Sequence, residues 1–334
     1  MPAKRIVVVG ATGSIGTSAA EVMREHPASF SPVAFAALSS KERCEALAAE
    51  FGAKAYVGEG AAVRAVEESD ADICLVATVG ESGIEPTLAA IEKGMDVALA
   101  TKEVLVMAGA QVVAAARRRG VRILPVDSEH SAIFQCVQAG GGKVSRLVLT
   151  ASGGPFLDGP EDLSSITPEI ALSHPRWKMG PKVTVDSSTM MNKGFEIIEA
   201  HWLFGIPPDR IDVVVHPQAI VHSLVEFEDG ATLAQLSPPD MRVAIQYALS
   251  WPGRLPARRE RLDLASIGSL EFRRPDERRF PAIALARKAL EMGGDAPARL
   301  AAADERAVAD FLAGKIGYTD IMKICKEALC SNGL

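Results

Sequence analysis

The chain has 334 residues and a formal net charge of −6 at neutral pH, with a calculated pI near 5.6. This length is long for a single hydrophobic core and predicts two or three domains. The mild negative charge provides no broad basic surface, so we expect neither nucleic acid nor a membrane among its partners. Any phosphate site must therefore be built locally from a few residues.

The five cysteines are scattered, without the spacing of a zinc site or a C-x-x-C redox motif. A strand is expected within five residues of the first Met, which leaves no room for a signal peptide. No apolar run reaches the roughly 20 residues of a membrane-spanning helix. We therefore expect a soluble protein of a reducing compartment, the cytoplasm.

Strand-like and helix-like segments alternate through the first 143 residues. Residues 5–9 form a continuous apolar run, and residues 10–16 turn directly from it into a helix. This alternation predicts an α/β domain at residues 1–143, built on a Rossmann-type parallel sheet. The expected strands are residues 5–9, 33–38, 73–77, 96–100 and 122–126, and the expected helices are residues 14–25, 41–51, 86–93 and 104–119.

The pattern changes at residue 144, where strands and helices no longer alternate regularly. We expect an α+β domain at residues 144–272, a proline-rich and charged linker at 273–282, and a helical domain at 283–334. In the α+β domain the expected strands are residues 146–150, 211–215, 221–227 and 231–236, with helices near 192–204 and 239–249. In the helical domain the expected helices are residues 281–292, 296–313 and 319–329.

The spacing of Gly10, Gly13 and Gly16 directly after a strand is typical of dinucleotide binding. Glycines let the backbone approach a pyrophosphate, and the helix that follows supplies amide donors at its positive end. The same spacing also occurs in plain tight turns and in loops that bind other phosphates. Because a strand precedes the motif and a helix follows it near the N-terminus, we favour a bound nucleotide. Its expected contacts lie between the first and last glycine, at Thr12, Gly13, Ser14 and Ile15.

The loop after the second strand indicates which nucleotide binds. An NAD site has an Asp or Glu there for the ribose hydroxyls, whereas this chain has Ser39, Ser40 and Lys41. Two hydroxyls and a cation suit a 2′-phosphate, so we expect NADPH. Glu42 keeps the alternative open, because a small shift in register would bring an acid near the ribose.

The segment V-D-S-S-T-M-M-N-K-G-F-E gathers the three kinds of donor that hold a phosphate dianion, in Ser187, Asn192 and Lys193. The turn that begins at Ser152 and continues with two glycines can add backbone amides. A carboxylate, Glu196, follows within one helical turn, which makes sense if a cation lies between it and the phosphate. The alternative is an ordinary helix start with a solvated i,i+3 ion pair.

Two more carboxylates, Asp127 and Glu129, follow a predicted strand, in the kind of loop where α/β sheets bind ligands. Ser128 between them is placed to reach a substrate. A helix cap with an acid in the first turn explains the same pattern. Together with Glu196, the two acids make a set of hard oxygen ligands suited to Mg²⁺ or Mn²⁺.

A segment without periodicity, bounded by proline and glycine, contains His174 and Trp177 and ends at Gly180. An ordinary surface loop would have this composition. We favour a lid that closes the indole over a substrate and excludes water, with His174 donating to the substrate. His130 is a candidate partner of a metal ligand.

Several motifs, in order and spread over the chain to about residue 317, resemble the 1-deoxy-D-xylulose 5-phosphate reductoisomerases. The resemblance implies an NADPH-dependent and metal-dependent bacterial enzyme that rearranges and reduces a phosphosugar, and a homodimer formed through the middle domain. Besides the segment that contains Ser187, the motifs are G-A-T-G-S-I-G (10–16), A-T-K-E (100–103), P-V-D-S-E-H (125–130), A-S-G-G-P-F (151–156), H-P-R-W-K-M-G (174–180) and H-P-Q (216–218).

The resemblance also implies roles for individual residues. The implied metal ligands are Asp127, Glu129 and Glu196. The implied catalytic residues are Lys102, Glu129 and His174. The implied substrate contacts are Lys102, Ser128, Glu129, Ser152, His174, Trp177, Ser187, Asn192, Lys193 and Glu196. The implied cofactor contacts are Thr12, Gly13, Ser14, Ile15, Ser39, Ser40, Lys41, Thr101, Glu103 and Gly180.

The chain departs from the family at two places. Thr101 stands where the family commonly has Asn, which removes an amide from an expected cofactor contact. The family also carries further helical sequence after the C-terminal bundle region, so we expect a shortened C-terminal domain. The last helix would then expose an apolar face of Ile321, Ile324 and Leu329, and would be the least stable part of the chain.

Two alternative functions remain open from the sequence. The G-A-T-G motif also begins semialdehyde dehydrogenases, which need a cysteine nucleophile paired with a histidine. Cys136 has no catalytic-looking surroundings in the sequence. The second alternative is an NADPH-binding pseudoenzyme with an incomplete C-terminal domain.

Overall fold

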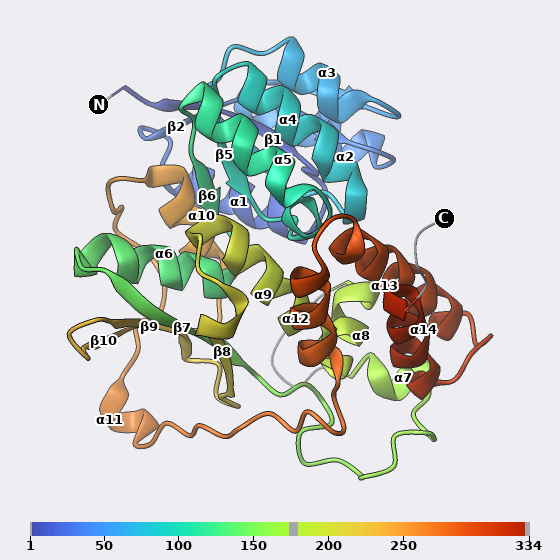
Figure 1. Cartoon of the computed structure of the whole chain (residues 1–334). Coiled ribbons are helices and arrows are strands. Elements are labelled where there is room, and N and C mark those ends of the chain that lie inside the picture. Colours follow the sequence, from blue (N-terminus) through green and yellow to red (C-terminus); the bar gives the residue numbers. More distant parts are fainter. Residues whose placement is uncertain (1, 174–179, 331–334) are drawn as a thin grey trace. The chain divides into compact units, whose positions relative to one another are not determined.

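In the computed structural model, which describes residues 2–173 and 180–330, the chain folds as two compact units (Figure 1). Unit 1 comprises Met1–Phe134 and Asp240–Glu260. Unit 2 comprises Gln135–Pro239 and Arg261–Leu334.

Unit 1 is built on a six-stranded, fully parallel sheet with the strand order β3-β2-β1-β4-β5-β6. The central strands β1 and β4 are almost entirely apolar and buried, which is expected when helices cover both faces of a parallel sheet. This confirms the predicted Rossmann-type fold. The strands are β1 (Lys4–Val9), β2 (Phe30–Ala37), β3 (Lys54–Val57), β4 (Ile73–Val76), β5 (Asp96–Leu99) and β6 (Ile123–Pro125).

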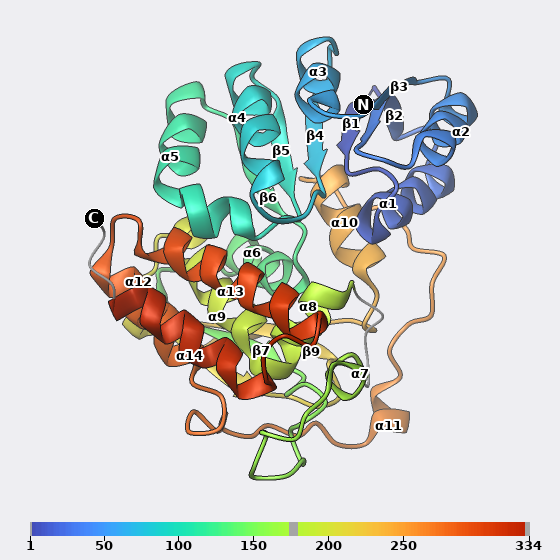
Figure 2. The ribbon, with the colours of Figure 1, turned by 90° about the vertical axis from the view of Figure 1, so that its right-hand side faces the viewer.

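Helices cover the two faces of this sheet. On one face α3, α4 and α5 lie side by side (Figure 2). On the other face, α1, α2 and α10 share a core with the sheet that includes Ile6 and Val8 of β1. The helices are α1 (Ser14–Glu25), α2 (Lys41–Phe51), α3 (Ala61–Glu67), α4 (Ile84–Glu92), α5 (Glu103–Arg119) and α10 (Met241–Ser250), with a 3₁₀ turn, η1 (Gly80–Gly83). Helix α6 (Ser128–Gly140) begins in unit 1 and ends in unit 2, since the boundary lies after Phe134.

Helix α10 belongs to unit 1, although the sequence boundaries placed it in the domain at residues 144–272. Its buried residues Ile245, Ala248 and Leu249 join the core formed by α1 and the sheet. The side chain of Asp240 caps the helix by accepting from the Arg242 amide at 2.9 Å. The chain therefore returns to the first unit after building the second sheet, which an analysis of local patterns does not reveal.

Unit 2 contains a mixed four-stranded sheet with the order β10-β9-β7-β8. Strands β7 and β8 are parallel, and the other pairs are antiparallel. The strands are β7 (Val144–Ala151), β8 (Ile211–Val215), β9 (Val221–Phe227) and β10 (Thr232–Leu236). The helices are α7 (Pro168–Ala171), α8 (Pro181–Thr189), α9 (Met191–Phe204), α11 (Leu264–Ile267), α12 (Ala282–Met292), α13 (Ala296–Leu312) and α14 (Tyr318–Cys330), with a 3₁₀ turn, η2 (Pro208–Arg210).

The C-terminal helices are part of unit 2 and are closely packed. Helix α9 contacts β7 and β8, and α12 contacts α9. At Gly194 of α9 an added Cβ would lie 3.0 Å from the Ala282 carbonyl oxygen of α12, so the two helix backbones approach closely. The helical region therefore does not form a third compact unit behind a linker.

The expectation that the last helix exposes an apolar face is wrong. Ile321, Cys325 and Leu329 of α14 are at most 3% exposed, and Ile324 is partly buried. Helix α14 packs against α13 and α12, and the buried Val308 and Phe311 of α13 lie on the facing helix. The prediction failed because it assumed that residues after the helix would have to bury its apolar face. The preceding helices α12 and α13 bury it instead.

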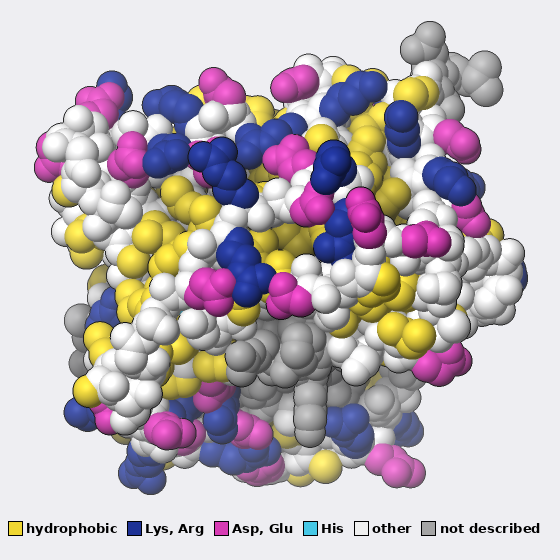
Figure 3. All heavy atoms as spheres, turned by 90° about the horizontal axis from the view of Figure 1, so that it is seen from below, with side chains coloured by type: hydrophobic (Ala, Val, Ile, Leu, Met, Phe, Trp, Pro, Cys, Tyr) yellow, Lys and Arg dark blue, Asp and Glu magenta, His cyan; other side chains and the backbone are white. Residues whose placement is uncertain are grey.

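The surface carries charges of both signs. On the face drawn in Figure 3, lysine and arginine side chains alternate with aspartate and glutamate, and no large area of one sign is visible. Within residues 2–173 and 180–330, no helix combines the length and the apolar character needed to cross a bilayer.

We expect His222 to make the stability of the protein depend on pH. This residue of β9 is buried, and its Nε2 lies 2.9 Å from the Ser237 hydroxyl. Burial lowers the pKa of His222 to about 4, whereas the unfolded chain titrates near pH 6.5. Between these values the unfolded state binds more protons, so stability falls as the pH drops from 6.5 towards 4, by on the order of 3 kcal/mol.

The measurement is the thermal unfolding midpoint between pH 7 and pH 4.5. In His222→Gln the unfolding midpoint should fall much less over this pH range, because Gln keeps a donor but does not titrate. The matched control His26→Gln replaces a partly buried histidine at the end of α1. Its unfolding midpoint should decline as in the unmutated protein. An unchanged decline in His222→Gln would contradict the assignment.

Candidate active site

The glycine-rich loop after β1 has the geometry expected for a dinucleotide. Gly10 has a φ of +83°, and an added Cβ would lie 2.2 Å from the Ala77 carbonyl oxygen. At Gly16 it would lie 2.5 Å from the Gly10 carbonyl oxygen. Only glycine fits these two positions without shifting the backbone, because neighbouring main chain occupies the space that a Cβ would need. This tight packing of strand, loop and helix is a feature of dinucleotide-binding loops.

The start of α1 is suited to an anion. Gly13 is the N-cap residue, no side chain caps the helix, and its first turn contains no acid. The amides at the helix start are therefore available at its positive end. The predicted cofactor residues Thr12, Gly13, Ser14 and Ile15 all lie in this turn.

The loop that contains Ser39, Ser40 and Lys41 lies beside the glycine-rich loop. Val9 of β1 pairs with Ala36 of β2, and the Gly10 amide donates to the Ala36 carbonyl at 3.0 Å. The two loops therefore leave the same edge of the sheet from neighbouring strands. Ser40 is the N-cap residue of α2, and Lys41 is exposed 3.9 Å from Glu45. Glu42, the open alternative, is exposed in the first turn of α2.

Thr101, Lys102 and Glu103 follow β5 at the same edge. Thr101 is 3% exposed, and its hydroxyl donates to the Thr78 carbonyl at 2.8 Å. The Thr101 hydroxyl, which stands in place of the asparagine amide common in the family, is thus engaged by the Thr78 carbonyl. A contact from this position to a cofactor would therefore come from the Thr101 backbone. Glu103 lies in the first turn of α5, directly after Lys102.

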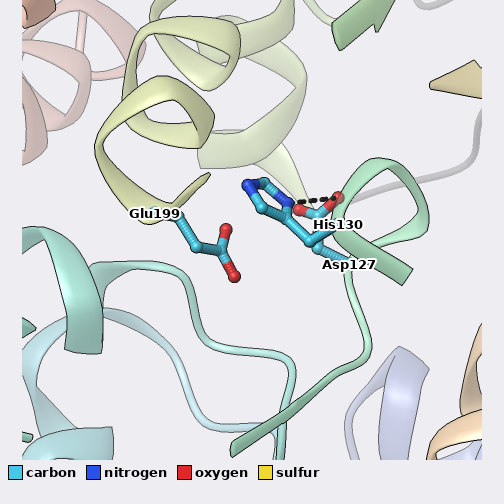
Figure 4. A group of neighbouring side chains, drawn as sticks. All are labelled: Asp127, His130 and Glu199. Atoms are coloured by element: carbon cyan, nitrogen blue, oxygen red, sulfur yellow. Dashed lines mark ion pairs between the residues drawn. The ribbon is translucent and has the colours of Figure 1, made fainter. Parts of the chain in front are cut away.

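An acidic group lies at the end of the neighbouring strand, β6. Lys102 Nζ is 2.6 Å from Asp127 Oδ2. His130 Nδ1 is 3.6 Å from Asp127 Oδ1, the ion pair that is dashed in Figure 4. Asp127 and Glu129 offer oxygens within 4.8 Å of each other. The structure therefore brings Lys102, Asp127 and Glu129 together at the ends of neighbouring strands. It also shows that His130 contacts Asp127.

The charge on Asp127 follows from these neighbours. Burial alone would raise the pKa of this carboxyl, but the Lys102 ammonium and His130 outweigh it and hold the pKa well below its usual value. Asp127 is therefore an anion at neutral pH. It also accepts a hydrogen bond from the Glu129 amide at 3.3 Å at the start of α6. Asp127 therefore caps this helix, as the alternative interpretation of the sequence has it, and also belongs to the acidic group. The Ser128 hydroxyl donates to Glu129 Oε2 at 2.8 Å.

In unit 2 the predicted phosphate donors lie around a break between two helices. Helix α8 ends at Thr189, and Met190 adopts a left-handed conformation (φ 64°) before α9 begins. Ser187 is in the last turn of α8, whereas Asn192 and Lys193 are in the first turn of α9. The break places a hydroxyl, an amide and an ammonium around the start of one helix.

Glu196 is 1% exposed and is held by the two donors before it. Asn192 Nδ2 donates to Glu196 Oε1 at 2.5 Å, and Lys193 pairs with the other carboxylate oxygen. A buried carboxylate needs such partners, because its charge is costly in an apolar environment. The i,i+3 ion pair of the alternative interpretation is present, but it is buried and not solvated.

The turn after β7 brings Ser152 to the same place. Gly153 and Gly154 have φ angles of +88° and +67°, and the Gly154 amide donates to Ser152 Oγ at 3.3 Å. A Cβ on Gly154 would lie 2.7 Å from the Ser187 carbonyl oxygen. The absence of a side chain at this position lets the turn lie directly against the end of α8.

Other predicted residues are placed differently. His174 and Trp177 lie outside the described residues. Gly180 is the exposed N-cap residue of α8. The sequence analysis did not single out Glu199, a fully buried carboxylate of α9 drawn in Figure 4. Glu199 follows Glu196 by three residues, so the two carboxylates lie on the same side of a helix. This spacing is the sequence feature from which Glu199 could have been found.

Comparisons with known proteins agree with this arrangement. Family models described as 1-deoxy-D-xylulose 5-phosphate reductoisomerase match residues 6–57 and 41–109, and models of its C-terminal domain match residues 123–204 and 236–333. The reductoisomerase of Symbiobacterium thermophilum is 50% identical, over 96% of this chain and 90% of that protein. The one from Heliobacterium modesticaldum is 48% identical, over 98% and 90%.

The chain belongs to the 1-deoxy-D-xylulose 5-phosphate reductoisomerase family. The reductoisomerase from Zymomonas mobilis in complex with NADPH has a TM-score of 0.91 and 39% identity, and covers 100% of this chain and 93% of that one. A reductoisomerase in complex with NADPH, fosmidomycin and magnesium has a TM-score of 0.92 and 39% identity, with coverage of 98% and 89%.

Family membership overturns the semialdehyde dehydrogenase alternative, and the chemistry of Cys136 agrees. This cysteine is buried in α6, and burial raises the pKa of its thiol to about 11. At neutral pH the group is a thiol, which is a poor nucleophile compared with a thiolate.

Proposed function

We propose that this chain converts 1-deoxy-D-xylulose 5-phosphate into 2-C-methyl-D-erythritol 4-phosphate with NADPH and Mg²⁺ or Mn²⁺, a step of non-mevalonate isoprenoid precursor biosynthesis. One observation carries the proposal. The dinucleotide loop and the anionic Asp127, paired with Lys102, lie at the carboxyl edge of one parallel sheet, where α/β folds bind ligands. Membership of the reductoisomerase family supports the same activity.

The residues present fit the proposed cofactors. Gly10 and Gly16 allow the close backbone packing of a dinucleotide-binding loop, and the start of α1 offers amides to the pyrophosphate. We assign the 2′-phosphate to Ser39, Ser40 and Lys41. When bound, NADPH supplies a hydride and the divalent ion supplies Lewis acidity.

We assign the metal to Asp127, Glu129 and Glu196. All three offer carboxylate oxygens, the hard ligands that Mg²⁺ and Mn²⁺ prefer. Lys102 and Lys193 compensate the charges of Asp127 and Glu196 in the structure. His130, which contacts Asp127, orients that carboxylate.

We assign the substrate phosphate to Ser152, Ser187, Asn192 and Lys193. These residues supply two hydroxyls, an amide and an ammonium from one region of unit 2. Binding of the phosphate, which does not react, supplies energy to orient the reacting end of the sugar. Because the donors are fixed by two helix ends and a glycine turn, little further ordering is needed when the substrate binds.

At the reacting end, the protein binds, orients and excludes water. Lys102, Ser128 and His174 hold the sugar hydroxyls while a retro-aldol and aldol sequence moves the carbon skeleton and leaves a branched aldehyde. Trp177 covers the substrate and excludes water. Hydride transfer and one proton then convert the aldehyde into the product alcohol, and the residues of the site supply the orientation.

We also propose a homodimer in the bacterial cytoplasm. Strand β10 forms one edge of the four-stranded sheet and exposes Thr232, Leu233 and Ala234, so this edge can pair with a second copy. The relatives are bacterial, and the five cysteines are all free thiols, as expected in a reducing compartment.

The activity is tested by NADPH oxidation with purified protein and 1-deoxy-D-xylulose 5-phosphate. We expect oxidation only when both the phosphosugar and Mg²⁺ or Mn²⁺ are present. A chelator should stop it, and added metal should restore it, since the carboxylates need the ion. Tight NADPH binding without metal-dependent oxidation would favour the pseudoenzyme instead.

Cofactor preference is tested by Lys41→Glu. In the unmutated protein NADPH should bind more tightly than NADH, because Lys41 offers a cation to the 2′-phosphate. The new carboxylate should repel that phosphate and narrow or reverse the preference, measured as the ratio of the two dissociation constants. The control Lys54→Glu, with the same charge change on exposed β3, should leave the ratio unchanged. Equal affinities in the unmutated protein would rule out the assignment.

The metal assignment is tested by Glu196→Gln. Loss of one anion should lower turnover by roughly 100-fold or more and weaken the metal dependence, while NADPH binding stays nearly unchanged. The control Glu305→Gln, on the exposed side of α13, should behave like the unmutated enzyme. Near-normal turnover of Glu196→Gln with an unchanged metal requirement would show that Glu196 is not a ligand.

A further inference from the structure

Tyr318, the first residue of α14, contacts a residue next to the proposed phosphate site. It is 3% exposed, and its hydroxyl donates to Ser188 Oγ at 3.1 Å. The Ser188 hydroxyl, itself fully buried, donates to the Val185 carbonyl at 2.6 Å. This chain of two hydrogen bonds joins the C-terminal helices to the last turn of α8, where Ser187 lies.

The ring of Tyr318 contacts the other part of the same site. Its edge-to-face contact with Phe156 has a centroid distance of 5.5 Å and an interplanar angle of 82°. Phe156 follows the turn of Ser152, Gly153 and Gly154 by two residues. One side chain therefore touches both segments that supply serine hydroxyls to the proposed site.

These two segments also touch each other. The Gly154 backbone lies so near the Ser187 carbonyl that an added Cβ would come within 2.7 Å of it. Helix α8 has only nine residues and ends at the left-handed Met190. A short helix with a break at its end has few interactions of its own to fix its last turn, so outside contacts determine where Ser187 lies.

We propose that Tyr318 is a positioning residue that holds Ser152 and Ser187 at the spacing required by the substrate phosphate. The inference rests on the proposed function for the identity of the phosphate. Tyr318 does not touch the substrate. It acts through Ser188 on one side and through Phe156 on the other.

The hydroxyl of Tyr318 distinguishes this role from simple packing. Phenylalanine would fill the same space, since the ring packs between Phe156 and Phe311. Burying a phenol hydroxyl has an energetic cost unless the group finds a partner, and here the partner is Ser188. Burial also raises the pKa of Tyr318 above its usual value, so the phenol is a neutral donor at physiological pH.

The test compares Tyr318→Phe, Ser188→Ala and the double variant with Tyr56→Phe. The control also removes a phenol hydroxyl that forms a hydrogen bond, here to Glu68 at 3.0 Å in unit 1. Three quantities are measured: KM for the phosphosugar, KM for NADPH, and the dissociation constant of inorganic phosphate by titration calorimetry. The phosphate measurement needs no turnover, so it separates failure of this proposal from failure of the proposed function.

We expect Tyr318→Phe to raise the KM for the phosphosugar and the phosphate dissociation constant together, by about 3- to 10-fold. The KM for NADPH should not change, kcat should change less than the phosphosugar KM, and Tyr56→Phe should match the unmutated enzyme. Ser188→Ala should have a similar effect, although it also removes the hydrogen bond to Val185. The double variant should be no worse than the stronger single variant, because both single variants remove the same Tyr318–Ser188 hydrogen bond.

A folded Tyr318→Phe with a lower unfolding midpoint but unchanged phosphosugar KM and phosphate affinity would overturn the proposal, because Tyr318 would then serve stability alone. Equal increases in the KM values of phosphosugar and NADPH would also overturn it, since they indicate general loosening. If Tyr318→Phe does not fold, Ser188→Ala decides alone by the same two constants.

Discussion

A carboxylate removed from water must have its charge compensated, and this constraint applies to Asp127 in unit 1 and to Glu196 in unit 2. In unit 1 Lys102 lies 2.6 Å from Asp127, and in unit 2 Lys193 pairs with the buried Glu196. Removing one partner of such a pair leaves a buried charge and is strongly destabilising. Each acid therefore requires its lysine for the fold before any ligand is considered.

The same pairing explains how these residues serve the proposed reaction. In the proposed metal site, a divalent ion would supply the positive charge that each lysine provides in the structure. With the carboxylates compensated in that way, Lys102 and Lys193 would have donors to give to a sugar hydroxyl and to a phosphate. On this proposal the lysines stabilise the fold without ligands and would bind substrate with them, which would account for lysines next to the acids.

Much of unit 1 could be predicted because its signals are local. Continuous apolar strands, glycine turns and helix periodicity fixed the helix at residues 41–51 and placed most other predicted ends within a few residues. Lys102 and Asp127 could be predicted to lie close together, because the carboxyl ends of parallel strands share one edge. Strand β3 and helix α3 were missed, since β3 has four residues and an exposed lysine and α3 has seven residues.

The break between α8 and α9 had no local signal. A left-handed residue at a helix end is usually glycine or asparagine, and here it is Met190. Without the break, Ser187 and Asn192 would lie on one continuous helix, five residues apart and on different faces. The contacts of Met190 within the folded unit, where it is 4% exposed, compensate the local backbone cost.

The C-terminal helices show how a wrong local expectation hid a contact between α14 and α8. Judged alone, the apolar face of α14 lacked cover, but α13 covers it and Tyr318 extends from its first turn to Ser188. Lys182 of α8 adds a second, partly buried link, 2.8 Å from Asp304 of α13. Two polar contacts from the last helices therefore fix α8 at both ends. A phosphate bound at the proposed site, if it binds only the ordered end of α8, would stabilise these contacts, so its binding and the stability of the C-terminal helices would be thermodynamically linked.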